Sequence, residues 1–207
     1  MTVLVFSDLH GEKKHKKLLS FIKGETWDVA FGLGDFGSKF TATCYKDVIK
    51  LPRIYTIYGN HDNVDEIKSY SGWLKDGYHL IDGLNVFALN GVWGNRGLPY
   101  HITVPQILPL MTMECDLLIT HEHPYGLSYN HHDGTFKFME DHGWHEEFLN
   151  AVIKVLKPKL WLYGHSYTAE PDRNIRGIRT YGVDSRFVLF NEEWRAMRVE
   201  NVAAVIF

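Results

Sequence analysis

The sequence predicts an α/β protein with a parallel sheet at its centre. Five short apolar runs are typical of buried strands, at 3–7, 29–31, 54–58, 116–120 and 160–163. Each run is followed closely by a polar residue that can bind a metal or a phosphate. Because the carboxyl ends of parallel strands meet at one crevice, these residues are expected to converge there.

The first expected helix spans residues 13–21 and carries a run of lysines. Leu18, Leu19 and Ile22 are expected on its buried side. The lysines favour a solvated helix face, with a phosphate-steering patch as the alternative. A second helix is expected over 45–51, because a proline follows it directly.

A hairpin is expected next, with strands at 78–81 and 86–89 around an Asp-Gly turn. Residues 91–105 are expected to form a loop near the crevice. Trp93, Arg96 and Tyr100 in this loop are candidates for substrate contact, with a packed surface loop as the alternative.

The last third of the chain begins with a helix at 143–156, before Pro158. The tail then alternates apolar and polar residues. This pattern predicts antiparallel strands that close a second sheet, at 178–181, 187–190, 194–199 and 202–207.

Six side chains with metal-binding chemistry follow the strands: Asp8, His10, Asp35, Asn60, His121 and His165. Oxygen and imidazole donors without thiolate suit Mn, with Fe, Zn or Ni as alternatives. Six ligands crowd one ion but serve two well. In an extended segment Asp8 and His10 would point the same way and bind one ion. Asn60, His121 and His165 would bind the other, with Asp35 as the bridge.

This ligand set predicts hydrolysis at a dinuclear centre. Two ions held roughly 3.5–4 Å apart can activate a shared water and bind both the attacking and the leaving oxygen of a phosphoryl group. Gly34, Gly59 and Gly164 each precede a predicted ligand directly, where glycine permits a sharp turn and a close approach.

Two further side chains are predicted to act in catalysis. His61 follows a ligand and is expected to be the general acid, and Asp62 is the nearest carboxylate that could hold its ring. His123 lies two residues from a ligand and is expected, with Arg96, to contact the substrate.

The ordered motifs resemble those of the calcineurin-like metallophosphoesterases, over positions 8–166. They are Asp8-x-His10, Gly34-Asp35, Gly59-Asn60-His61-Asp62, His121 and Gly164-His165. The length of 207 residues predicts a single domain over 1–207. The resemblance implies that it is folded as a four-layer αββα sandwich, with two mixed β-sheets flanked by helices, and that it carries a dinuclear centre. It also implies that Asp8, His10 and Asp35 hold one metal, that Asp35, Asn60, His121 and His165 hold the other, and that His61 is the acid.

Two features depart from the family patterns. Many phosphodiesterase members carry a second metal-binding histidine two residues after the first, where this chain has Tyr167. The phosphoprotein phosphatases carry an Asp-Arg pair shortly after their Gly-Asp, and Asp35 here is followed by Phe-Gly-Ser-Lys. The chain therefore matches neither subgroup fully. Its segment at 120–126 is similar to the Thr-His-x-Pro-Pro-Tyr-Gly stretch of compact bacterial phosphodiesterase-like members.

The expected activity is hydrolysis of a phosphate ester by a metal-bridging hydroxide, on a nucleotide-like phosphodiester. The alternatives are a phosphomonoesterase acting on phosphoprotein or nucleic-acid ends, and a non-catalytic scaffold of the same fold. The scaffold is disfavoured because every expected ligand is present.

The composition limits the kinds of binding partner that are expected. A net charge of −3 gives no sign of broad nucleic-acid binding. No apolar run reaches membrane-spanning length, and two cysteines do not suggest a disulfide framework. A cytoplasmic protein that acts on a small phosphate ester is therefore expected, with its protein partners unknown.

Overall fold

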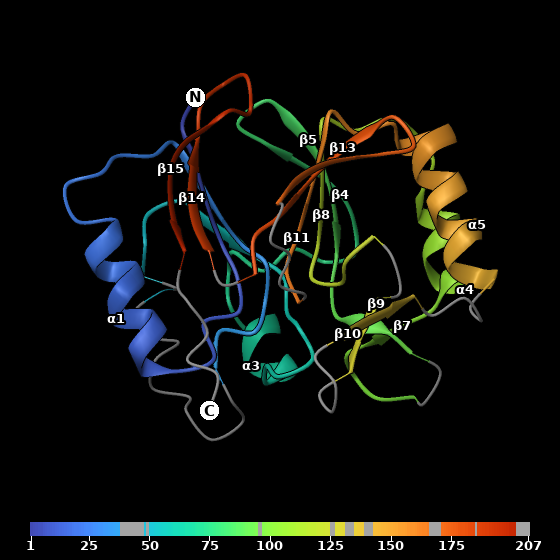
Figure 1. Cartoon of the computed structure of the whole chain (residues 1–207), viewed down its shortest axis with the longest axis horizontal. Helices are drawn as coiled ribbons and strands as arrows, with labels where there is room; N and C mark the ends of the chain where they lie inside the picture. The colour runs from blue at the N-terminus through green and yellow to red at the C-terminus, as the bar shows by residue number, and fades with distance from the viewer. Residues whose placement is uncertain are drawn as a thin grey trace.

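A computed structural model describes residues 1–37, 48, 50–94, 97–124, 127–130, 135–138, 143–165, 171–184 and 186–201. Two mixed β-sheets pack face to face, with helices on both outer sides (Figure 1). In Figure 1, α1 (Glu12–Phe21) covers one sheet, and α4 (Val104–Ile107) and α5 (Gly143–Ala151) cover the other. The predicted four-layer αββα sandwich is confirmed. That residues 1–207 form one domain stays a prediction.

The first sheet has five strands in the order β15-β14-β1-β2-β3. Its members are β1 (Val3–Phe6), β2 (Val29–Gly32), β3 (Ile54–Thr56), β14 (Arg186–Phe190) and β15 (Ala196–Asn201). β1, β2 and β3 run parallel, and β14 and β15 add to them in antiparallel pairs. All four residues of β1 are buried, as expected of a strand that is covered on both faces.

The second sheet has six strands in the order β12-β13-β11-β8-β5-β4. Its members are β4 (Gly77–Ile81), β5 (Leu84–Leu89), β8 (Leu117–Thr120), β11 (Leu160–Tyr163), β12 (Asp172–Ile175) and β13 (Ile178–Gly182). The four inner strands are parallel, and the two edge strands are antiparallel to their neighbours. The predicted hairpin is confirmed as β4 and β5, with Asp82 and Gly83 at positive φ in its turn.

Smaller elements complete the described chain. The helical ones are α3 (Val64–Lys68), a 3₁₀ turn (Leu108–Leu110) and a π-helical turn (Val152–Leu156) that continues α5. Two short strand pairs are β6 (Val92–Trp93) with β7 (His101–Ile102), and β9 (Leu127–Asn130) with β10 (Thr135–Phe138). The helix expected over 143–156 is formed by α5 and the π-helical turn, and it ends where Lys157 adopts φ 42° before a proline.

Three apolar clusters account for the layers. One lies between the sheets and includes Val5, Ile119 and Val188, all fully buried. A second joins the outer face of the five-stranded sheet to Leu18 and Phe21 of α1. The third joins the six-stranded sheet to α4 and α5.

Several expectations about the elements were wrong. Leu19 is exposed, because Leu18 and Phe21 are the α1 residues that face the sheet. Residues 91–105 are not all loop: they contain β6 and β7, and α4 begins at Val104 after a Thr103–Gln106 capping interaction.

The tail does not close one sheet by an antiparallel meander. β13 pairs parallel to β11 in the six-stranded sheet, whereas β14 and β15 complete the five-stranded sheet. Residues 45–47 and 49 of the helix expected over 45–51, and the whole strand expected at 202–207, lie outside the described residues. Within the part of the chain that the structure describes, none of the helices has the length and hydrophobicity of a transmembrane span.

Candidate metal centre

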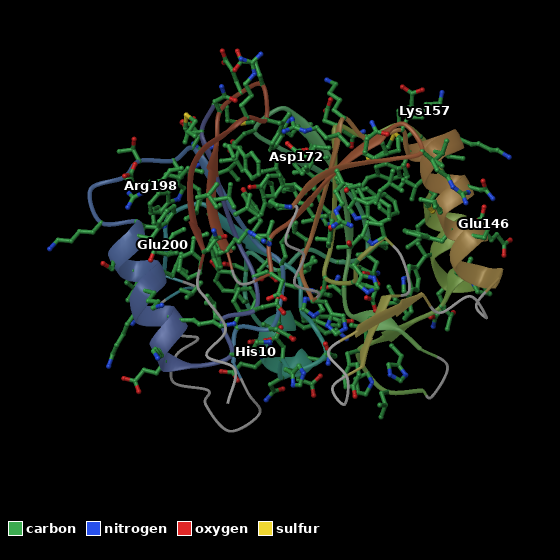
Figure 2. All side chains as sticks on the ribbon, in the orientation of Figure 1. His10, Glu146, Lys157, Asp172, Arg198 and Glu200 are labelled. Atoms are coloured by element: carbon green, nitrogen blue, oxygen red, sulfur yellow. The ribbon has the colours of Figure 1, made fainter. Side chains whose placement is uncertain are left out.

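The six predicted ligands come together where strands of both sheets end. Asp8 and His10 follow β1, Asp35 follows β2, and Asn60 follows β3; His121 and His165 follow β8 and β11. Figure 2 labels His10 at the lower end of the sheets, on the side where α3 lies, and Glu146 on the outer helix α5. The ligands were expected at the edge of one parallel sheet. They come instead from two sheets whose carboxyl ends meet.

Two trios of side chains have donor atoms close enough to share an ion. Donor atoms of Asp8, His10 and Asp35 lie within 4.8 Å of one another, and so do those of Asp35, His121 and His165. Asp35 is common to both trios, as a bridging ligand would be.

The surroundings of the Asp35 carboxylate suit a cation ligand. Its Oδ1 accepts the His61 backbone N–H at 2.9 Å. Its Oδ2 is buried and has no hydrogen-bond donor among the described residues. The nearest ring nitrogens to Oδ2 are His121 Nε2 at 3.4 Å and His10 Nε2 at 3.6 Å. A buried carboxylate oxygen surrounded by metal-binding nitrogens fits a bound divalent ion.

His121 is oriented for metal binding by the first sheet. Its Nδ1 lies 2.7 Å from the Leu33 carbonyl, an acceptor that fixes the proton on Nδ1. Its Nε2 is therefore left to face the cluster, 3.3 Å from Asn60 Oδ1. His121 is fully buried.

Asp8 is held by a second set of contacts. Ser7 Oγ donates to Asp8 Oδ2 at 2.5 Å, and the His165 backbone N–H donates to the same oxygen at 3.0 Å. Lys14 Nζ donates to the Asp8 carbonyl at 2.9 Å. Ser7 was not predicted as a site residue, although its place before the first ligand could have drawn attention to it.

Four of the six ligands adopt left-handed backbone conformations. The φ values are 56° at Asp8, 45° at His10, 55° at Asp35 and 62° at His165. Such conformations are uncommon for residues other than glycine and tend to gather at functional sites. The expectation that Asp8 and His10 lie in an extended strand, with side chains on the same side, was therefore wrong. Sharp turns after β1 bring them to the cluster.

Glycine is required at Gly59 by this crowding. A Cβ there would meet the Asp35 carboxylate and lie 2.5 Å from His121 Nε2. Any side chain at this position would push two predicted ligands apart.

Asp62 has a different role from the one expected. Its Oδ2 accepts the backbone N–H groups of Asp35 at 2.7 Å and Gly59 at 2.8 Å, and its Oδ1 accepts that of Phe36 at 2.8 Å. These contacts tie the loop after β2 to the loop after β3. The carboxylate therefore holds the backbone around the ligands, and the described structure shows no hydrogen bond from it to the His61 ring.

The other predicted residues lie as follows. His61 is exposed, and its ring centroid is 5.1 Å from that of His10. His123 is buried beside Glu122, with its ring 6.2 Å from that of His165. Trp93 packs its ring on Phe148 of α5, in the third apolar cluster, which joins the six-stranded sheet to α4 and α5. Arg96 and Tyr167 lie outside the described residues.

Glu122 was not predicted. It is buried, and its Oε1 lies 3.3 Å from His123 Nδ1 while its Oε2 accepts the Trp93 backbone N–H at 3.3 Å. Burial raises its pKa, but the neighbouring histidines outweigh burial and hold the pKa below its usual value.

The protonation states of the cluster reflect its dense negative charge. Burial opposes a charged imidazole at His121, but the carboxylates of Asp35 and Asp8 outweigh burial and raise its pKa to about 10. Burial raises the pKa of Asp35, but the imidazoles of His121 and His10 and the His61 backbone N–H outweigh burial and hold that pKa well below its usual range. Burial and the Asp35 charge raise the pKa of Asp62 to about 6.

Metal binding is therefore expected to release protons. At pH 7, below a pKa of about 10, His121 carries a proton that a metal must displace from Nε2, so apparent metal affinity should rise with pH through this range. Calorimetry of Mn²⁺ binding in buffers of different ionisation enthalpy should show about one proton or more released per chain. No proton release would mean that His121 is not a ligand.

The comparisons with known proteins agree with this geometry. Residues 1–180 match the family model described as the calcineurin-like phosphoesterase superfamily domain. The chain belongs to this superfamily. Membership indicates a phosphoesterase that binds divalent metals, and the two trios are its candidate ligand groups.

Solved structures show the same fold at low sequence identity. One crystal structure matches with a TM-score of 0.69 at 12% identity, over 98% of this chain and 99% of that chain. A hypothetical protein from Thermus thermophilus matches with a TM-score of 0.58 at 12% identity, over 97% of each chain. A structure described as a novel phosphatase from Mycoplasma pneumoniae matches with a TM-score of 0.54 at 10% identity, over 97% of this chain and 92% of that chain. No curated protein sequence matches the chain significantly.

Proposed function

We propose that this member of the superfamily is a dinuclear metal-dependent phosphodiesterase that acts on a small, nucleotide-like substrate. The observation that carries the proposal is the position of Asp35 Oδ2. It is buried, it lacks a hydrogen-bond donor among the described residues, and its carboxylate belongs to both trios of candidate ligands.

The ligands are proposed to divide between two ions along the two trios, with Asn60 added to the trio of Asp35, His121 and His165. Asp8, His10 and Asp35 would hold one ion, and Asp35, Asn60, His121 and His165 would hold the other. Mn²⁺ suits this mixture of carboxylate, amide and imidazole donors, with Fe, Zn or Ni as alternatives. Such ions supply a nucleophile at neutral pH and balance the charge of the phosphoryl group.

The chain's own side chains then have distinct tasks. His61 is exposed next to His10, and its ring is proposed to give a proton to the leaving oxygen. The His61 backbone N–H donates to Asp35 Oδ1, and this hydrogen bond fixes the position of the proposed acid relative to the proposed bridging ligand. Asp62 holds the two loops that carry them. His123 and Arg96 are proposed to contact the substrate.

A diester is favoured over a monoester because the Asp-Arg pair of the phosphoprotein phosphatases is absent after Asp35. The net charge of −3 is consistent with a small substrate rather than a long nucleic acid.

The proposal is tested by hydrolysis assays on chelator-treated protein reloaded with Mn²⁺, Fe²⁺, Zn²⁺, Ni²⁺ or Mg²⁺. Bis-nitrophenyl phosphate represents the diesters, and nitrophenyl phosphate and a phosphopeptide represent the monoesters. Mn²⁺-dependent hydrolysis with a higher kcat/KM for the diester is expected. A preference for the monoesters would replace the diester assignment, and no hydrolysis with any ion would contradict the proposal.

A further inference from the structure

Asn90 lies directly after β5, at the end of the six-stranded sheet nearest the metal centre. Its side chain is fully buried. Its Oδ1 accepts the Tyr58 backbone N–H at 3.0 Å and Trp73 Nε1 at 3.0 Å. Its Nδ2 donates to the Leu74 carbonyl at 2.9 Å and to Asp76 Oδ1 at 2.8 Å, and its backbone N–H donates to the same Asp76 oxygen at 2.8 Å.

These contacts use the whole hydrogen-bonding capacity of the carboxamide. An asparagine side chain offers two N–H donors and two acceptor lone pairs, and here each meets a partner of the opposite kind. The partners also settle which way the amide faces, because a flipped amide would set N–H groups against the Tyr58 and Trp73 donors. A buried network in which every member is satisfied has one well-defined arrangement.

The network reaches the metal centre through Tyr58. Both backbone polar groups of Tyr58 are held, because its carbonyl also accepts the Gly91 N–H at 2.7 Å. Two residues further on, Asn60 Oδ1 lies 3.3 Å from His121 Nε2. Tyr58 follows β3 of the five-stranded sheet, whereas Asn90 and Gly91 follow β5 of the six-stranded sheet.

We propose that Asn90 is a positioning residue that sets the loop carrying Asn60 and His61 against His121, across the junction of the two sheets. Four of the six proposed ligands follow strands of the five-stranded sheet, with Asn60 on the loop after its edge strand β3, and the other two follow strands of the six-stranded sheet. The position of one sheet relative to the other at this edge therefore decides whether Asn60 can share an ion with Asp35 and His121. The inference rests on the proposed dinuclear site.

The test compares Asn90→Ala with Asn85→Ala, its matched control. Asn85 lies at the opposite end of the same strand, where its Nδ2 donates to the Glu114 carbonyl at 2.8 Å. Metal-free proteins are titrated with Mn²⁺ by calorimetry, and Asn60→Ala identifies the binding step that needs Asn60. Asn90→Ala should weaken that step by about 10–100-fold, the usual effect of removing an outer-shell partner, and leave the other step unchanged. Asn85→Ala should bind as the wild type does.

Thermal unfolding shows that each variant is folded at the titration temperature. Asn90→Ser, whose hydroxyl keeps part of the hydrogen bonding, is titrated in parallel and should give an intermediate loss in the same step. With diester substrate at saturating Mn²⁺, kcat should fall for Asn90→Ala while KM changes little.

Wild-type affinity at both steps in a folded Asn90→Ala or Asn90→Ser would overturn the inference and leave the proposed function intact. An equal loss at both steps would also overturn it, because a general loosening of the fold does not distinguish the Asn60 loop. If the wild type binds two Mn²⁺ and hydrolyses none of the esters, the proposed function fails while the positioning effect can still be measured.

Discussion

Asp35→Asn is expected to abolish turnover and to weaken the binding of both metal ions. The Asp35 carboxylate belongs to both candidate trios, so removal of its charge affects two ions at once. A metal contributes several kcal/mol to the stabilisation of transition-state charge, and about 1.4 kcal/mol corresponds to tenfold in rate. A loss of at least about 10³-fold in kcat/KM is therefore expected. Metal content after dialysis, measured with turnover, checks both parts of the prediction.

Asp82→Asn is the matched control. Asp82 also has a left-handed backbone, with φ 51° against 55° at Asp35, but it lies in the hairpin turn and pairs with Arg53. Asparagine tolerates this conformation, so both substitutions remove a charge without backbone strain. Asp82→Asn should keep both ions and the full rate. An Asp35→Asn protein that also keeps them would remove Asp35 from its bridging position.

His61→Ala is expected to slow turnover by about 10²–10⁴-fold, the usual contribution of general acid–base catalysis. Both ions should stay bound, because only the His61 backbone N–H contacts the Asp35 carboxylate and alanine keeps that group. The loss should be largest for substrates with poor leaving groups and small for nitrophenyl esters, whose leaving oxygen needs little protonation. Rates for a series of esters with different leaving groups, measured with metal content, test this.

His79→Ala serves as the control for loss of an imidazole, since His79 lies on the edge strand β4 and contacts the Lys75 carbonyl. It should leave every rate unchanged. A loss in His61→Ala that is equal for all leaving groups would assign His61 to substrate positioning rather than to proton transfer.

The strands that carry the site were predictable because their residues are apolar on both faces. Every residue of β1, β8 and β11 is buried. A short, mostly apolar run such as Leu117–Thr120 therefore identifies a strand without an alternation of polar and apolar residues. The division of the tail between two sheets was not predictable in this way. Both β13 and β14 contain enough apolar residues to be recognised as strands, but the choice of partner depends on which strand edge each meets in the folded chain.

The convergence of the six ligands was also predictable, because each follows a buried strand. Their local geometry was not, since a left-handed conformation at Asp8 or His10 leaves no mark in the sequence that alternation rules can detect. The role of Asp62 depends on contacts with Asp35 and Phe36, which lie 27 and 26 residues away. Asn90 had a usable signal: like three of the ligands, it is a polar residue after an apolar strand with a glycine beside it.

A stoichiometric titration shows whether two ions in one shared site support hydrolysis. Chelator-treated protein is supplied with increasing Mn²⁺ under tight-binding conditions, and diester hydrolysis is followed at each addition. A two-metal site predicts that the rate is negligible without metal and stops rising at about two equivalents per chain. Full activity in the metal-free protein, or a rate that stops rising at a single equivalent, would contradict it.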